Sequence, residues 1–326
     1  MAVRPLPRLR LATLPTPLVR AERLEAALGR DLDCPPIWIK RDDLTGFALA
    51  GNKARKLEFL VADARERGCD VLLTGGGPGS NHCQATAAAA AATGFGCRIV
   101  YYGTEPSTPP PNLRLARMVG AEVVFTGDPE RSSVDARLEE EAEALRAEGR
   151  SPSVIPRGGA TSVGSVGYAL AARELSEQLV AVGVEPALVL LATGSCGTQA
   201  GLVAGTVELG RPWRVVGASV SRPPEECLER VLRIAMGCAD LLGTPPPGPD
   251  DIDLRDARGP GYGVASAEGA SAAALLARTE GLYLDPVFTA KAMAALLDIV
   301  HAGSPGPMVF VHTGGLAALL GEKGEA

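Results

Sequence analysis

The stretch "DVLLTGGGPGSNHCQATAAAAAATG", residues 70–94, decides the fold class of this chain. Its first part, "DVLLTGGG", predicts a buried strand that enters a glycine turn. The part from Ser80 onward predicts a helix, with Ser80 or Asn81 as its N-cap and Gly94 at its C-terminal end. Strand, glycine turn and helix in this order are the repeating unit of a parallel α/β sheet.

The same alternation continues along the chain and predicts two units. The first runs from about Asn52 to Gly159, with further strands at 97–103 and 121–127 and helices ending at Met118 and covering 132–149. The second has strands at 187–193, 213–220 and 307–315, and helices after a glycine-rich loop at 158–165 and at 197–209, 225–237, 265–280 and 289–300.

We therefore predict an α/β protein of two domains, each an open, mostly parallel sheet flanked by helices. The larger domain would comprise residues 1–51 and 160–326, and the smaller one residues 52–159. A cleft between two such domains is a common place for a ligand.

The composition excludes several classes of function. A net charge of −6 gives no footprint for nucleic acid or for an anionic membrane. The sequence shows no signal peptide and no apolar run long enough to span a bilayer. Seven cysteines without a C-x-x-C pair and three histidines without metal-ligand spacing predict no metal site. We expect a soluble, cytoplasmic protein.

Lysine is scarce, since only five of the 32 basic residues are lysines, yet two stand together in "AGNKARKLEFL", residues 50–60. Asn52 is expected to cap a helix that starts at Lys53. The helical period places Lys53 on an apolar stripe with Leu57, Leu60 and Ala64. It turns Arg55 and Glu58 the other way and leaves Lys56 at the edge, as a surface charge or a charge behind the site.

This position suits a reactive amine. The dipole of the helix N-terminus and the loss of water both disfavour the ammonium form of Lys53. A neutral amine can attack a carbonyl and form a Schiff base, which a guanidinium cannot do. The alternative is a lysine that merely extends from the edge of the core to water.

Two glycine-containing loops before helices predict anion sites. In "ATGSCGTQAG", residues 192–201, the backbone amides of Gly194 to Thr198 would face a phosphate, although a plain turn has the same pattern. In "GPGSNHC", residues 77–83, Ser80 and Asn81 would meet a carboxylate, or would serve only as helix caps.

Six stretches together resemble a known family over almost the whole chain, from about Leu14 to Leu320. They resemble the D-cysteine desulfhydrases and 1-aminocyclopropane-1-carboxylate deaminases, which are pyridoxal-phosphate enzymes of fold type II with a tryptophan-synthase-β-like fold. The stretches are "KRDDLTGFALAGNKARKLEFL", "GSNHCQATAAAAA", "IPRGGATSVGSVGYALAARE", "TGSCGTQAGL", "DPVFTAKAMAALLD" and "FVHTGG".

The resemblance implies roles for particular residues. Lys53 would form the Schiff base with pyridoxal 5'-phosphate, and Lys53, Ser80 and Tyr262 would be catalytic. Asn81 would contact the ring oxygen of the cofactor, and Thr313 and Gly314 would lie near the ring nitrogen. The phosphate would be held by Thr193, Gly194, Ser195, Cys196, Gly197 and Thr198. The substrate would be met by Ser80, Asn81, His82, Tyr262, Phe288 and Thr289.

The chain departs from the family pattern at several positions. Phe288 stands where the desulfhydrases have a second tyrosine, and a phenyl ring can neither donate a hydrogen bond nor transfer a proton. Thr289 matches the desulfhydrases, whereas the cyclopropane deaminases carry a glutamate there, which argues against ring opening. Gly79, Gln84 and Ala85 also differ from the usual family residues.

The resulting prediction is a pyridoxal-phosphate dependent lyase that converts D-cysteine to pyruvate, hydrogen sulfide and ammonia, as a homodimer acting on a small amino acid. The alternatives are a 1-aminocyclopropane-1-carboxylate deaminase, elimination from another β-substituted amino acid such as cysteate, and β-replacement in specialised metabolism. A non-enzymatic alternative is a protein that binds pyridoxal phosphate or an amino acid without turnover.

Overall fold

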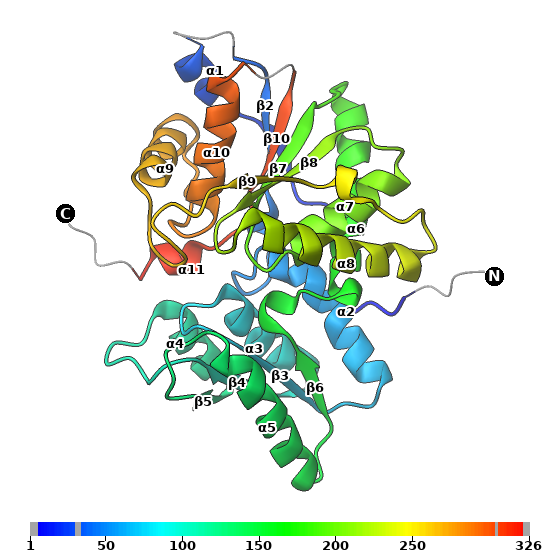
Figure 1. Ribbon diagram of the computed structural model, residues 1–326, viewed down its shortest axis with the longest axis vertical. Helices are drawn as coiled ribbons and strands as arrows, with labels where there is room; N and C mark the ends of the chain where they lie inside the picture. The colour runs from blue at the N-terminus through cyan, green and yellow to red at the C-terminus, as the bar shows by residue number, and fades with distance from the viewer. Residues whose placement is uncertain (1–5, 30–33, 304–305, 322–326) are drawn as a thin grey trace.

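The computed structural model describes residues 6–29, 34–303 and 306–321, and it contains two sheets (Figure 1). One sheet has six strands in the order β1-β2-β10-β7-β8-β9, and the other has four in the order β5-β4-β3-β6. All pairings are parallel except that of β1 with β2. The predicted α/β class with mostly parallel sheets is confirmed.

The elements follow one another with short connections. The strands are β1 (Leu18–Arg20), β2 (Ile37–Lys40), β3 (Val71–Gly76), β4 (Gly96–Tyr101), β5 (Glu122–Phe125), β6 (Pro152–Ile155), β7 (Leu188–Thr193), β8 (Arg214–Ser219), β9 (Asp253–Asp256) and β10 (Met308–Val311). The α-helices are α1 (Glu22–Leu28), α2 (Asn52–Glu66), α3 (Asn81–Thr93), α4 (Pro111–Met118), α5 (Ser133–Ala147), α6 (Ser162–Val182), α7 (Gly197–Glu208), α8 (Pro224–Leu242), α9 (Ala267–Glu280), α10 (Thr289–His301) and α11 (Leu316–Leu319).

The strand, turn and helix that decide the fold form as predicted. Every residue of β3 is buried, as expected for a strand covered on both faces. Ser80 is the N-cap of α3, and its hydroxyl accepts a hydrogen bond from the Cys83 amide at 3.3 Å. Gly94 ends α3 in the left-handed conformation, with φ of 79°.

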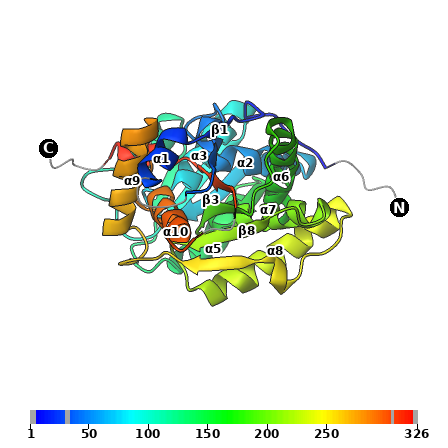
Figure 2. The ribbon, with the colours of Figure 1, turned by 90° about the horizontal axis from the view of Figure 1, so that it is seen from above.

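The larger sheet is covered on both faces (Figure 2). Val189 and Leu191 of β7 pack into a core with α6, α7 and α8. Their neighbours Leu188 and Leu190 point to the opposite face and pack with α1, α9 and α10. Helices on both faces explain why the strands read as continuous apolar runs.

Four short strands, three of them at sheet edges, escaped the sequence analysis. β1, β2, β6 and β9 have three or four residues each, and β1, β6 and β9 lie at the edges of their sheets. The helix expected at 225–237 is longer and covers Pro224–Leu242.

Helix α2 lies between the two sheets (Figure 1) and packs against both α3 and α6. The predicted boundary between the domains therefore falls on the first residue of a helix that contacts both halves. The outermost ends of the predicted larger domain, residues 1–5 and 322–326, lie outside the described residues.

Because α2 is enclosed, its expected polar face does not exist. The prediction that Arg55 and Glu58 point away from the core, with Lys56 at the edge, is wrong: these side chains are only 2%, 1% and 1% exposed. Each finds a polar partner inside the protein. Glu58, for example, accepts hydrogen bonds from the amides of Leu11 and Ala12 at 2.8 and 2.9 Å.

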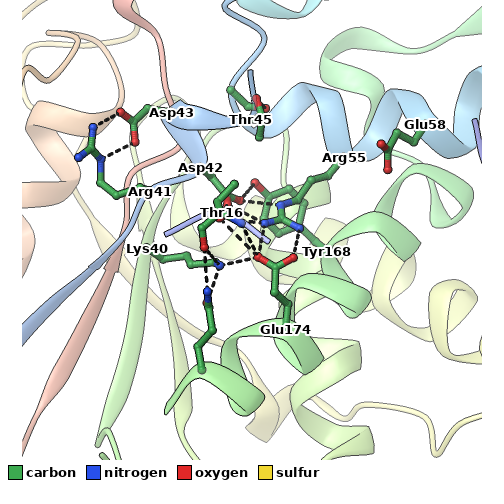
Figure 3. A network of polar contacts seen from close by, with 12 residues as sticks. Thr16, Lys40, Arg41, Asp42, Asp43, Thr45, Arg55, Glu58, Tyr168 and Glu174 are labelled. Atoms are coloured by element: carbon green, nitrogen blue, oxygen red, sulfur yellow. Dashed lines mark hydrogen bonds and ion pairs between the residues drawn. The ribbon is translucent and has the colours of Figure 1, made fainter. Parts of the chain in front are cut away.

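Arg55 is the centre of a buried network (Figure 3). Its guanidinium binds Asp42, just after β2, at 2.9 and 3.0 Å, and Glu174 of α6 at 2.8 and 2.9 Å. Asp42 also accepts the Tyr168 hydroxyl at 2.5 Å. Lys40 donates to Glu174 at 2.5 Å.

The charges in this network depend on one another. Burial alone would raise the pKa of Asp42, but the charge and hydrogen bonds of Arg55 reverse this and hold the pKa below its usual value. Burial lowers the pKa of Lys40, with Glu174 opposing that shift. Removing one member would leave an uncompensated charge in the interior.

Within the part of the chain that the structure describes, no helix is both long and apolar enough to cross a bilayer.

We predict that Arg55→Met lowers the free energy of unfolding by about 3–5 kcal/mol, because Asp42 and Glu174 would be left buried without their partner. Arg117→Met is the control, since Arg117 and its partner Glu105 are both exposed. It should cost less than about 1 kcal/mol. Urea denaturation measures both, and equal effects would contradict the proposed role of the network.

Candidate active site

A cavity of about 1040 Å³, including its open mouth, lies where the two sheets meet. One wall comes from the loop between β3 and α3 and from the start of α2, and the other from the β7–α7 loop, the 258–263 loop and the start of α10. The predicted site residues in its lining are Lys53, Ser80, Asn81, His82, Thr193, Gly194, Ser195, Cys196, Thr198, Tyr262, Phe288, Thr313 and Gly314.

Two predicted site residues, Gly197 and Thr289, are not part of the lining. Gly197 instead allows close packing, since a Cβ there would lie 3.0 Å from the Cα of Ala160. Thr289 is fully buried, and its hydroxyl donates to Oδ2 of Asp285 at 2.6 Å.

Lys53 occupies the first turn of α2 and faces the cavity. Burial lowers its pKa to about 8, against the opposing effects of Asp285 and Lys56. About a tenth of the Lys53 amine is therefore neutral at pH 7, far more than for an ordinary lysine, and a reaction with a carbonyl requires the neutral form.

Lys56 lies inside the protein beside Lys53 and is not the surface charge that was one of the expectations. Its ammonium nitrogen donates to the carbonyl oxygen of Gly158 at 2.5 Å. Burial, and then the charge of Lys53, lower the pKa of Lys56 well below its ordinary value. The two amines therefore share one desolvated site.

Asn52 does not cap α2, contrary to the prediction. Gly51, with φ of 53°, holds the N-cap position, and no side chain caps this helix. A Cβ on Gly51 would lie 2.3 Å from the carbonyl oxygen of Thr313, so the helix starts where only glycine fits. The Asn52 side chain instead donates to the Thr198 hydroxyl at 2.9 Å and ties α2 to the start of α7.

The β7–α7 loop is built as an anion cradle. Cys196, with φ of 75°, precedes α7, and its carbonyl oxygen accepts the first helical bond from the Ala200 amide at 2.9 Å. The earlier amides of the helix have no carbonyl one turn before them and are available to a ligand. Gly158, in the segment after β6, packs closely against this loop, because a Cβ there would lie 2.4 Å from Ser195.

The start of α3 offers a second set of free amides. The first helical hydrogen bond runs from the Gln84 amide to the carbonyl oxygen of Ser80, at 3.3 Å. The amides of Asn81 and His82 come before it and have no helical carbonyl to bind. Asn112 of α4 donates to Oδ1 of Asn81 at 2.9 Å. The Asn81 amide nitrogen is thereby the group available to a ligand. Asn112 was not identified from the sequence, because its partner Asn81 lies 31 residues away.

The ring of His82 is neutral: Nε2 donates a hydrogen bond and Nδ1 is an acceptor. Thr74 donates its hydroxyl proton to the carbonyl oxygen of Ile155 at 2.7 Å, so it must accept from Nε2 of His82 at 3.0 Å. Nδ1 is then unprotonated, and it is buried without a partner in the described residues. Burial, and then Lys56 and Lys53, lower the pKa of His82 well below its ordinary value. An anion would therefore meet the backbone amide of His82 and not its ring.

Tyr262 sits on a glycine-rich loop that Lys291 holds in place. The Lys291 amine donates to the carbonyl oxygens of Arg258 and Gly261 at 2.7 and 2.8 Å. The Tyr262 ring lies 6.1 Å from that of Phe288, at an interplanar angle of 71°. Burial raises the pKa of Tyr262, so its hydroxyl stays protonated and can donate.

The 312–315 loop closes the far end of the cavity. Nε2 of His312 lies 2.9 Å from the carbonyl oxygen of Tyr283, and the Gly314 amide donates to Nδ1 at 3.3 Å. This pattern requires a neutral imidazole, in agreement with the pKa that burial lowers. Thr313 and Gly314 are thus fixed in the lining.

The lining also contains residues that the sequence analysis did not assign to the site. Asp285 is fully buried and accepts hydrogen bonds from the amides of Val287, Phe288 and Thr289. Asp285 stands just before a predicted helix, and an aspartate at such a position is a recognisable capping signal. Further lining residues outside the predicted set include Tyr102, Arg131, Arg157, Ser221 and Arg222.

The arrangement brings a partly neutral amine together with two sets of free helix amides. It can accommodate a small carbonyl compound and two anionic groups, one at the start of α7 and one at the start of α3. Within the described residues, no cluster of side chains suits a metal ion.

Comparisons with known proteins agree with this chemistry. A family profile described as "Pyridoxal-phosphate dependent enzyme" matches residues 9–314. D-cysteine desulfhydrase of Yersinia enterocolitica is 42% identical, covering 96% of this chain and 95% of the relative. D-cysteine desulfhydrase of Klebsiella pneumoniae is 40% identical, with 96% and 95% covered. A crystal structure described as an ACC deaminase homologue has a TM-score of 0.88 and 35% identity, covering 96% of this chain and 93% of that one.

We predict that the Lys53 amine titrates near pH 8, the value to which burial lowers its pKa. Reductive methylation by formaldehyde and cyanoborohydride, mapped by peptide mass spectrometry, would follow it in the cofactor-free protein. The labelling rate should fall as the pH drops through about 8, because protonation removes the nucleophile. A midpoint above 10, as for an ordinary lysine, would contradict the assignment. Lys53→Met should lose the labelled site, whereas Lys56→Met should keep it.

Proposed function

Because the chain belongs to the family of pyridoxal-phosphate dependent enzymes, we propose that it is a lyase that eliminates the β-substituent of a small amino acid. D-cysteine is the proposed substrate, and the products are pyruvate, hydrogen sulfide and ammonia. The observation that carries the proposal is the Lys53 amine, with a pKa of about 8, between two sets of free helix amides. The desulfhydrase relatives, at 40–42% identity over almost the whole chain, support the choice of substrate.

The residues present fit pyridoxal 5'-phosphate. Lys53 would hold its aldehyde carbon covalently, and the β7–α7 loop, from Thr193 to Thr198, would hold the phosphate. The side-chain nitrogen of Asn81 would donate to the ring oxygen, because Asn112 already donates to the side-chain oxygen of Asn81. Thr313 and Gly314 would lie near the ring nitrogen. This fit rests on the free amides before Ala200 and on the glycine at position 158, where a side chain would meet Ser195.

When bound, the cofactor provides an electron sink for the bond that breaks at the α-carbon. The chain's own residues then orient the substrate and move its protons. The substrate carboxylate would bind the free amides at the start of α3 together with Ser80. Lys53 or Ser80 would take the α-proton, and Lys53 is suited to this because burial keeps a fraction of it neutral.

The departing sulfur is the step at which this chain differs from the family pattern. Phe288 occupies the position of an expected tyrosine and cannot supply a proton. Tyr262 remains as the hydroxyl on this wall, and burial keeps it protonated. Tyr262 is therefore the proposed donor at the leaving group, held in place by the contacts of Lys291 with its loop.

We also propose that the enzyme is cytoplasmic and a homodimer. No disulfide joins Cys69, Cys83, Cys97, Cys196, Cys227 and Cys238, which favours a reducing compartment. Light scattering after size exclusion measures the dimer, and a monomer at micromolar concentration would contradict it.

The first test is a visible absorption spectrum of the reconstituted protein before and after D-cysteine is added. Cofactor absorbance that shifts while pyruvate accumulates is the expected result, and Lys53→Ala should abolish both. Parallel assays with 1-aminocyclopropane-1-carboxylate distinguish the deaminase alternative, which the solved homologue keeps open. Bound cofactor with no product from any amino acid would favour the binding protein without turnover. Failure to bind the cofactor would overturn the lyase proposal itself.

We predict that Phe288→Tyr raises kcat/KM for D-cysteine about tenfold or more, since a positioned proton donor contributes about 10²–10⁴ in rate. Phe288→Leu is the matched control, because it changes the packing against Tyr262 without adding a hydroxyl. Steady-state pyruvate assays measure both variants. Equal rates for the tyrosine variant and the wild type would show that position 288 only packs.

A further inference from the structure

Arg131 lines the cavity and lies over the face of Tyr262. It stands in the loop between β5 and α5, so it reaches the site from the smaller sheet, whereas Tyr262 comes from the loop after β9. Its guanidinium carbon is 4.0 Å from the centre of the Tyr262 ring, which is the geometry of a cation–π contact. A cation–π contact uses the charge of the guanidinium and leaves its N–H groups able to donate hydrogen bonds.

The other two arginines of the lining are already paired. Arg157 donates to both carboxylate oxygens of Asp135, at 3.0 and 2.7 Å. Arg222 is paired with Glu226 of α8. Among the described residues, no carboxylate lies within ion-pair distance of Arg131. Arg131 therefore brings a positive charge into the cavity that the protein itself does not neutralise.

The two anions of the proposed reaction do not require this charge. The cofactor phosphate would be held by the start of α7, and the substrate carboxylate by the start of α3. Arg131 belongs to a third place, the wall formed by Tyr262 and Phe288. Phe288 also closes on the β7–α7 loop, since a Cβ on Gly194 would lie 3.2 Å from its ring. This wall thus faces a third part of the substrate, its side chain.

We propose that Arg131 determines specificity for substrates whose β-substituent carries a negative charge. This inference rests on the proposed elimination and names the class of side chain that it acts on. An arginine stays protonated at working pH and cannot act as an acid, but it can bind an anion through several N–H groups at once. Sulfur as a thiolate, or as a fixed sulfonate, meets this description.

The step balances without a further reactant except water. The Cα–H bond breaks and its proton goes to Lys53 or Ser80, and the Cβ–S bond breaks with its electron pair leaving on sulfur. A Cα–Cβ double bond forms, and water then releases pyruvate and ammonia. A thiolate takes a proton from Tyr262 and departs as hydrosulfide, whereas a sulfonate departs as sulfite without a proton. Both products are anions that Arg131 can bind. The positive charge of Arg131 stabilises the departing anion, in place of the hydroxyl that Phe288 lacks.

The binding test uses the cofactor-loaded full chain and two compounds that lack the α-amino group and so cannot react. These are 3-sulfopropanoate, which carries the sulfonate, and butanoate, which has a methyl group in its place. Calorimetry should show that Arg131→Gln lowers the affinity for 3-sulfopropanoate about 10- to 100-fold, because charged hydrogen bonds are lost. Butanoate binding should change less than threefold.

Arg137→Gln is the control variant, because it removes the same charge from α5 at a residue paired with Glu141 outside the cavity. It should leave both affinities unchanged. Arg131→Lys should restore part of the sulfonate affinity. An equal loss for both compounds, or no loss for either, would overturn the inference.

Turnover separates the inference from the proposed function. For the wild type, kcat/KM is measured with cysteate and with 3-chloroalanine, whose β-substituent is neutral. Arg131→Gln should reduce the ratio of the two values about tenfold or more. A wild type that forms pyruvate but whose ratio is unchanged in the variant would leave the lyase in place and refute the role of Arg131. A wild type with no pyruvate from any substrate would refute the lyase, while the binding test would still decide whether Arg131 selects an anion.

Discussion

The site depends on the buried contacts of Arg55 with Asp42 and Glu174. Arg55 lies in α2 between Lys53 and Lys56, so the network that fixes Arg55 also fixes the helix that presents both amines. A charged residue in an enclosed helix can keep its position only if its partners are in place, because each partner would otherwise be a buried charge. The geometry of Lys53 is thus determined by ion pairs on the opposite side of its own helix.

The two halves of the molecule each contribute one helix start with free backbone amides, α3 from the smaller sheet and α7 from the larger. Two contacts from α2 hold these halves in register: Asn52 binds Thr198 of α7, and Lys56 binds the carbonyl oxygen of Gly158. Any opening of the cleft between the sheets would strain one of them. The first turn of α2, which carries Lys53, is therefore fixed relative to the start of α7.

The sequence predicted what local patterns encode. The unit of β3, glycine turn and α3 was readable because its strand is wholly apolar and its cap and C-terminal glycine are local signals. Lys53, Ser80 and Thr198 lie around one cavity. This could be expected, because the helices that follow parallel strands begin at the same edge of the sheet. Asn52, Lys56 and Asn112 could not be predicted, because their partners are far away in the sequence: the pairs are 146, 102 and 31 residues apart. Helical periodicity assigned a polar face to α2, and only the tertiary packing shows that this face is enclosed.

The scarcity of lysine has a consequence for the outside of the molecule. Lys40, Lys56 and Lys291 are 1–2% exposed and Lys53 faces the cavity, while Lys323 lies outside the described residues. Throughout the described part of the chain, every cationic side chain on the exterior is therefore an arginine. Guanidinium groups keep their protons far into alkaline solution, where amines lose theirs. The exterior should hold its charge balance as the pH rises, and it offers almost no amine for acetylation, ubiquitin attachment or immobilisation on an activated support.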